Sequence, residues 1–220
     1  MNVKMKINSW SECSISDYFR LKDITNDETI EPADKEIAVL SVLSGLTEDE
    51  IWNLNITDFK ELQSKTLWTS TPVMRPLDKI RFRNIEINGE KYAVETDITK
   101  FTVAQYIDFQ TFWQNKHEEQ YIASILACFI IPKNKKYAEG YEINKLKDDI
   151  MNCLDIQTAY EIMSFFLLRW LGSTQASLDC LSTMTKKMMK GKNLDQQREE
   201  QMAKVEDLRK NISDGLKLLV

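Results

Sequence analysis

Residues 156–171, IQTAYEIMSFFLLRWL, decide the fold class of this chain. A helix built from this stretch is apolar on more than one face, and such a helix packs among other helices. Gly172 follows directly and is a typical helix stop. The stretch therefore predicts a central helix, whose core positions are Ile156, Ala159, Ile162, Met163, Phe166 and Trp170.

The composition of the whole chain agrees with a mainly helical protein. Six Gly and four Pro in 220 residues supply few of the turns that a many-stranded sandwich or barrel needs. The chain is 43% hydrophobic and 29% charged, which is enough apolar material for a core and argues against global disorder. We expect a mainly α, helical bundle-like protein with a small β-hairpin and a C-terminal helical arm.

The hairpin is predicted at about residues 80–95, around the dipeptide Asn88-Gly89. Both residues tolerate positive φ, which favours a two-residue type I′ turn. The turn sets this register: Ile87 opposite Glu90, Ile85 opposite Tyr92 and Arg83 opposite Val94. Residues 1–7 also alternate between apolar and polar side chains, and they are a candidate third strand.

Capping and turn residues divide the rest of the chain. The first two helices are predicted from Ser14 to about Lys22 and from Pro32 to Gly45. A third helix is predicted to begin at a capping box of Thr47 and Glu50, and a fourth is predicted to begin after a cap at Thr57. Later helices are predicted at Val103–Asn115, at His117–Ile130 and at Ile143–Asn152. The predicted parts are an N-terminal helical part (1–75), the hairpin (76–98), an apolar helical core (99–172) and a C-terminal helical arm (173–220).

Charge is distributed unevenly along the chain, whose net charge is −5. Residues 1–70 carry 7 basic and 13 acidic side chains, whereas residues 186–220 carry 9 basic and 6 acidic ones. The gradient favours head-to-tail or partner association, with a solvated mixed-charge surface as the alternative. The acidic balance disfavours a general nucleic-acid binder. The apolar run 121–131 is too short to span a bilayer, so no membrane association is expected.

The sequence offers little catalytic chemistry. Cys13, Cys128, Cys153 and Cys180 are far apart and form no CxxC pair, so buried reduced thiols are expected. The single histidine, His117, opens a polar helix start, where a solvated or capping role is expected. The known metal and nucleotide motifs do not occur. The residues therefore predict no catalytic site, no cofactor, no metal and no small-molecule substrate.

Two sets of residues are candidates for partner binding. The first is the stripe of the C-terminal arm at Val205, Leu208, Ile212 and Leu219. The alternative for this arm is a terminal helix that folds back on its own domain. The second is the set of cations at Arg81, Arg83, Lys133, Lys135 and Lys136. With Tyr92 or Tyr137 for stacking, these cations could bind an acidic partner or nucleic acid, and a solvated surface is the alternative.

Three stretches of the sequence resemble known proteins. They are Leu40–Ile51 with Leu54 and Ile56-Thr-Asp58; Ile85–Tyr92 leading into Ile98–Asp108; and Cys128–Tyr137 with Gly140-Tyr141, Ala159 and Ser164-Phe-Phe166. In this order they are similar to virion-morphogenesis proteins of tailed bacteriophages, particularly crAss-like and related phages of gut Bacteroidetes. The resemblance covers about residues 35–170 and carries over no catalytic residue.

The resemblance implies a non-enzymatic role in tail or neck assembly, as a structural component of the virion. The expected partners are other virion proteins and copies of this chain. The expected location is the host cytoplasm during assembly, and then the virion. Two alternatives remain open: a tail assembly chaperone that is not retained in the virion, and a small acidic regulator that binds a host protein.

Overall fold

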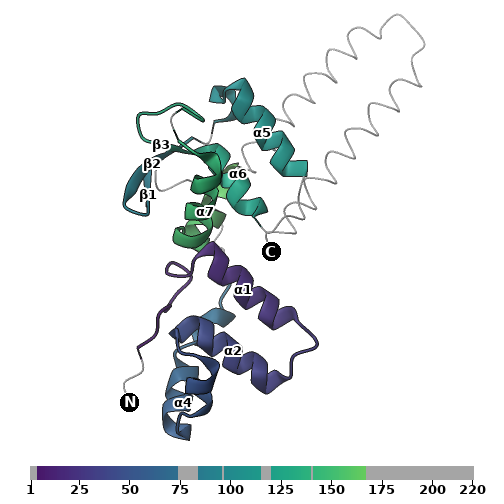
Figure 1. Ribbon diagram of the computed structural model, residues 1–220, viewed down its shortest axis with the longest axis vertical. Helices are drawn as coiled ribbons and strands as arrows, with labels where there is room; N and C mark the ends of the chain where they lie inside the picture. Colours follow the sequence, from purple (N-terminus) through teal and green to yellow (C-terminus); the bar gives the residue numbers. More distant parts are fainter. Residues whose placement is uncertain (1–3, 74–83, 96, 115–119, 140, 167–220) are drawn as a thin grey trace, which may run out of the picture. The chain divides into compact units, whose positions relative to one another are not determined.

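The computed structural model describes residues 4–73, 84–95, 97–114, 120–139 and 141–166. Helices form most of these residues, and three short strands form one antiparallel sheet (Figure 1). The predicted mainly α class with a small hairpin is therefore confirmed. The chain divides into two compact units, Met1–Met163 and Ser164–Val220, and every labelled element of Figure 1 belongs to the first unit.

The N-terminal part is built from short capped helices. They are α1 (Ile15–Asn26), α2 (Pro32–Ser44), α3 (Glu48–Trp52) and α4 (Ile56–Ser64), followed by the 3-10 turn η1 (Leu67–Ser70). Gly45 ends α2 with a φ of 77°, a left-handed conformation that glycine adopts without strain. Thr47 and Glu50 form the predicted capping box. These local signals place the end of α2 and the start of α3 correctly, whereas α1 runs to Asn26 and not to about Lys22 as predicted.

The cap of α4 differs from the prediction. Asn55, not Thr57, is the N-cap, because its side-chain oxygen accepts hydrogen bonds from the amides of Thr57 and Asp58 at 3.0 and 2.9 Å. Asparagine is at least as good a cap as threonine, and it stands two residues earlier. Helix α4 therefore starts at Ile56.

The sheet has the order β1 (Asn84–Ile87), β2 (Glu90–Val94) and β3 (Ile130–Pro132). The register pairs Ile85 with Tyr92 and Ile87 with Glu90, as predicted. Asn88 and Gly89 have φ values of 52° and 78°, which the type I′ turn requires. The hairpin register therefore follows from the turn residues alone.

The predicted third strand is wrong in its position. Strand β3 pairs with β2, whereas no strand forms at residues 4–7. There the amides of Lys6 and Ile7 donate to the carbonyl of Leu43 at the end of α2, at 3.0 and 2.9 Å, and Ile7 is buried. Residues 130–132 leave a buried helix directly beside β2, so they occupy the third place in the sheet.

The remaining helices are α5 (Val103–Gln114), α6 (Tyr121–Phe129), α7 (Ile143–Cys153) and a helix over residues 156–166. Every residue of α6 from Ile122 to Phe129 is buried. In the last helix Ile156 and Ile162 are fully buried, as expected for a central helix. The predicted continuation of this helix to Leu171 lies outside the described residues, as does the C-terminal arm.

Two distant stretches of the first unit meet where α1 begins. The amide of Ile15 donates to the carbonyl of Leu154 at 3.1 Å, and the amide of Ile156 donates to the carbonyl of Cys13 at 2.8 Å. Ser14 and Asp155 thereby form an isolated antiparallel bridge. The bridge joins the start of the N-terminal helices to the helices that end the unit.

Candidate functional site

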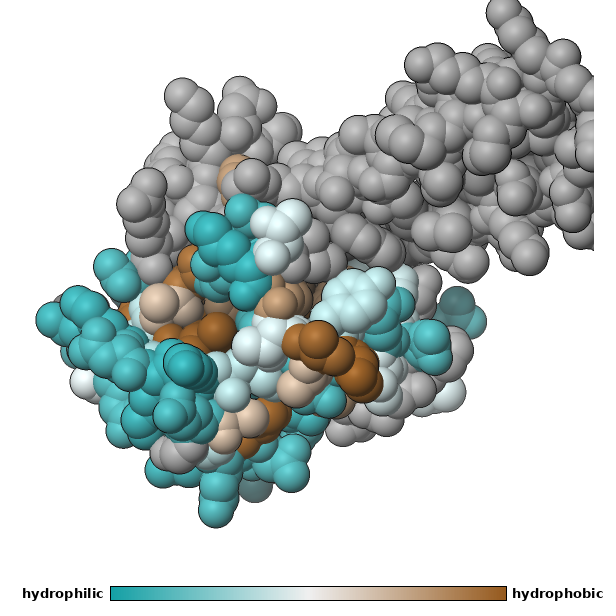
Figure 2. All heavy atoms as spheres, turned by 90° about the horizontal axis from the view of Figure 1, so that it is seen from above, coloured by the Kyte–Doolittle hydropathy of each residue, from teal (hydrophilic) through white to brown (hydrophobic). Residues whose placement is uncertain are grey.

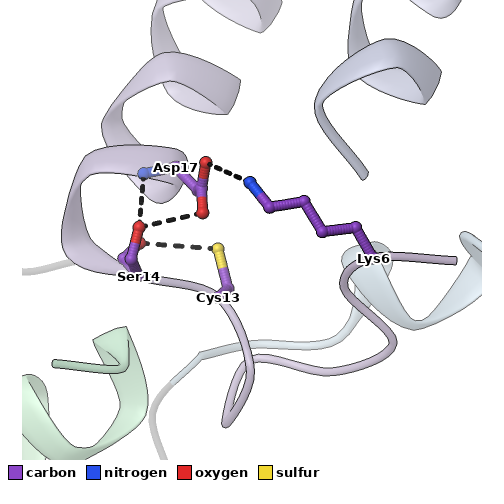
Figure 3. Close-up of polar contacts among 4 residues, drawn as sticks. All are labelled: Lys6, Cys13, Ser14 and Asp17. Atoms are coloured by element: carbon purple, nitrogen blue, oxygen red, sulfur yellow. Dashed lines mark hydrogen bonds and ion pairs between the residues drawn. The ribbon is translucent and has the colours of Figure 1, made fainter. Parts of the chain in front are cut away.

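The thiol of Cys13 lies beside the cap of α1 (Figure 3). Its sulfur donates a weak hydrogen bond to the carbonyl of Ser14 at 3.6 Å, and the Nζ atom of Lys6 lies 3.5 Å from Asp17. Burial, and secondly the carboxylate of Asp17, raise the pKa of Cys13 from 9.0 to about 12. The thiol therefore stays protonated and is not a nucleophile at neutral pH.

A second buried thiol, Cys128, ends a short polar chain. The hydroxyl of Tyr137 donates to Asp108 at 2.8 Å and lies 3.9 Å from the Cys128 sulfur. Burial raises the pKa of Cys128 to about 12 and also raises the pKa of Tyr137. The chain fixes the loop after β3 to α5 and provides no reactive group. Cys153, by contrast, is exposed, so the prediction of a buried thiol was wrong there.

The predicted cationic patch is described only in part. Lys133, Lys135 and Lys136 are exposed on the loop after β3, whereas Arg81 and Arg83 lie outside the described residues. Tyr92 and Tyr137 are only 5% and 8% exposed, so neither ring is available to stack on a nucleic-acid base. The predicted stacking partners are therefore wrong.

Two other predictions fall outside the described residues. They concern His117 and the C-terminal stripe of Val205, Leu208, Ile212 and Leu219. Their roles stay predictions. Within the described ranges, no helix combines the length and the apolar character that a bilayer crossing needs. The same ranges hold no cluster of His, Cys, Asp and Glu placed to bind a metal ion.

A stripe on α5 is the candidate functional site. Val103, Tyr106 and Ile107 are 78%, 46% and 56% exposed. Their spacing of three and four residues places them on one side of the helix. Seen from above, brown apolar side chains form small exposed islands between teal polar ones (Figure 2). Scattered apolar residues are normal on a surface, but three neighbours on one helix form a surface suited to a partner.

A neighbouring side of α5 holds the helix in place. Gln105, Phe109 and Trp113 are buried there. The Phe109 ring lies 5.8 Å from that of Phe129 in α6, and the Gln105 side chain donates to the carbonyl of Cys128. Because these contacts fix the rotation of α5, the stripe is held outward.

The start of α5 is fixed by a reciprocal cap. The Thr102 hydroxyl accepts from the amide of Gln105 at 3.1 Å, and the Gln105 side-chain oxygen accepts from the amide of Thr102 at 3.2 Å. The sequence analysis predicted a helix at Val103–Asn115 but did not identify the exposed stripe on it. The sequence signal that could have found the stripe is the presence of two sets of residues at helical spacing within the twelve residues of α5. One set is 103, 106 and 107, and the other is 105, 109 and 113.

An aromatic hollow of about 170 Å³ lies in the N-terminal part, lined by Ser9, Trp10, Trp68, Thr71, Pro72, Val73 and Gln157. The Trp10 indole donates to the carbonyl of Thr71 at 2.9 Å and meets the Trp68 ring edge-on at 4.8 Å. Among the described residues, the buried Nε1 of Trp68 has no hydrogen-bond partner. A hollow of this volume can accommodate several water molecules or a small ligand.

Comparisons with known proteins found no related protein. No protein-family model matches the chain, and no curated protein or solved structure matches it either. The functional argument therefore depends on the chain's own surfaces.

Proposed function

We propose that this chain is a non-enzymatic virion-morphogenesis protein of a tailed phage. It acts in tail or neck assembly through protein–protein contacts and stays in the virion as a structural component. The observation that carries the proposal is the exposed stripe of Val103, Tyr106 and Ile107 on an anchored helix. The sequence resemblance to phage morphogenesis proteins supplies the biological setting.

The stripe suits a helix or an apolar groove of another protein. Burying one large aliphatic side chain fully contributes about 1.5–3 kcal/mol relative to exposure. Val103 and Ile107 are more than half exposed in the isolated chain, so each has about half of this free energy or more still to gain. The buried side of α5 is already packed, so binding needs no rearrangement of the fold.

The two buried thiols offer no nucleophile, which favours binding over catalysis at their positions. Cys13 and Cys128 are buried, and their raised pKa values keep them protonated at neutral pH. A chaperone of tail assembly is the second candidate, because it could use the same stripe to hold an unassembled virion protein. The two candidates differ in whether the chain remains in the finished particle.

The test combines mass spectrometry of purified virions with a double variant, Val103→Ser with Ile107→Ser. We expect the unmodified chain at a fixed number of copies per virion and the double variant reduced at least about tenfold, since each lost contact weakens binding. Ala104→Ser is the matched control, because it changes an exposed α5 residue without removing a large apolar side chain.

The outcomes separate the candidates. Trace amounts in the virion, with failed assembly in the double variant, favour the chaperone. Normal incorporation of a correctly folded double variant contradicts the role of the stripe. Normal particles formed without the chain contradict both assembly functions.

A further inference from the structure

The aromatic hollow of the N-terminal part already holds a short proline-containing segment of this chain. The Trp10 indole donates to the carbonyl of Thr71 at 2.9 Å, and Pro72 and Val73 line the hollow beside it. Thr71 has a φ of −85° and a ψ of 143°, close to the angles of about −75° and about 145° of a polyproline II helix. The hollow therefore binds an extended backbone through an indole donor and the carbonyl that precedes a proline.

Aromatic rings hold the walls of the hollow in place. The rings of Trp10 and Trp68 meet at 84° with their centroids 4.8 Å apart, so they form two sides of a corner. Tyr18 packs edge-on against Trp10 at 5.8 Å, and Tyr160 packs edge-on against Tyr18 at 6.0 Å. A ligand that binds between side chains already fixed in this way causes little further loss of conformational entropy.

The free space in the hollow limits the size of a ligand. This space is about 170 Å³, and an engineered cavity of about 150 Å³ binds benzene. Pockets for drug-sized molecules begin at about 300 Å³. The hollow therefore takes one ring of five or six atoms, such as the five-membered ring of a proline.

A free polar group on the wall can bind the carbonyl that precedes such a ring. The Gln157 side chain lines the hollow, is half-buried, and takes part in no hydrogen bond among the described residues. Its amide N–H groups can donate to a carbonyl of a ligand. The Nε1 of Trp68 also lacks a partner within the described ranges, but this atom is buried, so Gln157 is the accessible donor.

We propose that the hollow binds a proline residue in an extended segment of another protein. The proline ring packs in the corner between Trp10 and Trp68, and the Gln157 amide donates to the carbonyl of the residue before the proline. Proline-rich segments dock in aromatic-lined grooves because their polyproline II backbone is formed before binding. The contact with the partner thus repeats the contact with Thr71 and Pro72. This inference goes beyond the proposed function and does not depend on it.

The first experiment follows the indole N–H signals of the full-length chain by NMR, with isotope-labelled tryptophan. The probe is an acetylated, amidated hexapeptide that repeats Thr-Pro-Pro twice, and the control peptide has Ala in place of every Pro. We expect saturable shifts at Trp10 and Trp68, with a dissociation constant of about 1 mM or lower. The signals of Trp52 and Trp113 should not move, because these residues belong to α3 and α5 and do not line the hollow.

A pair of glutamine variants tests the proposed donor. Gln157→Met keeps the length of the side chain and removes its amide, so it should weaken binding of the proline peptide about threefold to tenfold. Gln114→Met is the matched control and should leave the affinity unchanged, because Gln114 is exposed on α5. Trp68→Ala should abolish binding, and circular dichroism checks that each variant is folded.

Three results would overturn the proposal. The first is the absence of saturable shifts at Trp10 and Trp68 up to about 10 mM proline peptide, ten times the expected dissociation constant. The second is equal binding of the alanine peptide, or tighter binding of a peptide with Phe in place of every Pro, since the hollow would then not select proline. The third is an unchanged affinity in a folded Gln157→Met chain, which would contradict the hydrogen bond that positions the ligand.

Discussion

Helices α5 and α6 are both rich in apolar residues, yet they use them differently. Helix α6 buries every residue from Ile122 to Phe129, whereas α5 buries only Gln105, Phe109 and Trp113. The exposed residues of α5 include a stripe of three large apolar side chains, Val103, Tyr106 and Ile107. The apolar content of a helix therefore shows that the helix can be buried. The number of neighbouring elements decides how many of its sides are buried.

The largest expected effect is on stability, at the last residue of α6. Phe129 is fully buried, with its ring centroid 5.5 Å from that of Phe101 and 5.8 Å from that of Phe109. Phe129→Ala should lower the free energy of unfolding by about 3–5 kcal/mol, because it removes apolar burial and leaves a cavity. Urea denaturation measures this change in the free energy of unfolding. A loss below about 1 kcal/mol would show that α6 is not the core of this unit.

The second effect concerns the thiol at the end of α6. Burial raises the pKa of Cys128 from 9.0 to about 12, so at pH 8 only about one molecule in 10⁴ carries the thiolate. In a Cys180→Ser chain, iodoacetamide should modify exposed Cys153 rapidly and Cys128 only upon unfolding. Peptide mass spectrometry measures both positions.

The same shift predicts a pH dependence of stability. The folded pKa of Cys128 lies above the unfolded value, so its contribution to stability is complete below about pH 9 and is lost as pH rises towards 12. The decline of unfolding free energy over this window should be smaller in Cys128→Ala than in the unmodified chain. Rapid modification of Cys128 at pH 8 in the folded state would contradict its burial.

The third effect tests what anchors α5 against its neighbours. Tyr137→Phe removes the hydroxyl that donates to Asp108 at 2.8 Å, and it should cost about 1–3 kcal/mol of unfolding free energy. Tyr106→Phe is the matched control, because Tyr106 is 46% exposed on α5 and its substitution should change stability by less than about 0.5 kcal/mol. Equal effects of the two substitutions would contradict the anchoring role.

The smallest expected effect is on the stability of the exposed stripe. Val103→Ser with Ile107→Ser should change the unfolding free energy by no more than about 1 kcal/mol, since both side chains are mostly exposed. Thermal denaturation of the isolated chain measures this. A large loss would show that the stripe belongs to the core, and the contrast between α5 and α6 would disappear.

Local signals explain which parts of the fold could be predicted. Gly45, the Thr47–Glu50 box and the Asn88–Gly89 turn act through neighbouring backbone groups, so the sequence identifies them directly. The partner of β2 depends on where α6 ends in space, a distance that no local pattern contains. The third strand was therefore assigned to residues 1–7 in place of 130–132.

The candidate site was harder to predict for the same reason. Both sides of α5 are apolar, and only the positions of α6 and of the loop around Tyr137 decide which side is covered. The basic residues Lys133, Lys135 and Lys136 are exposed, as both the partner-binding prediction and its solvated alternative require. The prediction that Tyr92 or Tyr137 stacks beside these cations was wrong, because both rings are buried in the core.

The bridge between Ser14 and Asp155 bears on the order in which this protein can fold during synthesis. About 140 residues separate Ser14 from Asp155 in the sequence. At 5–20 residues per second the ribosome needs roughly 7–28 s to synthesise the residues between them. Until then the Ile15 amide lacks the Leu154 carbonyl that it pairs with in the finished unit. The start of α1 therefore gains its contacts with residues 154–156 only after these residues have been synthesised. The rate at which residues 154–166 are translated thus limits how soon this unit can complete its fold.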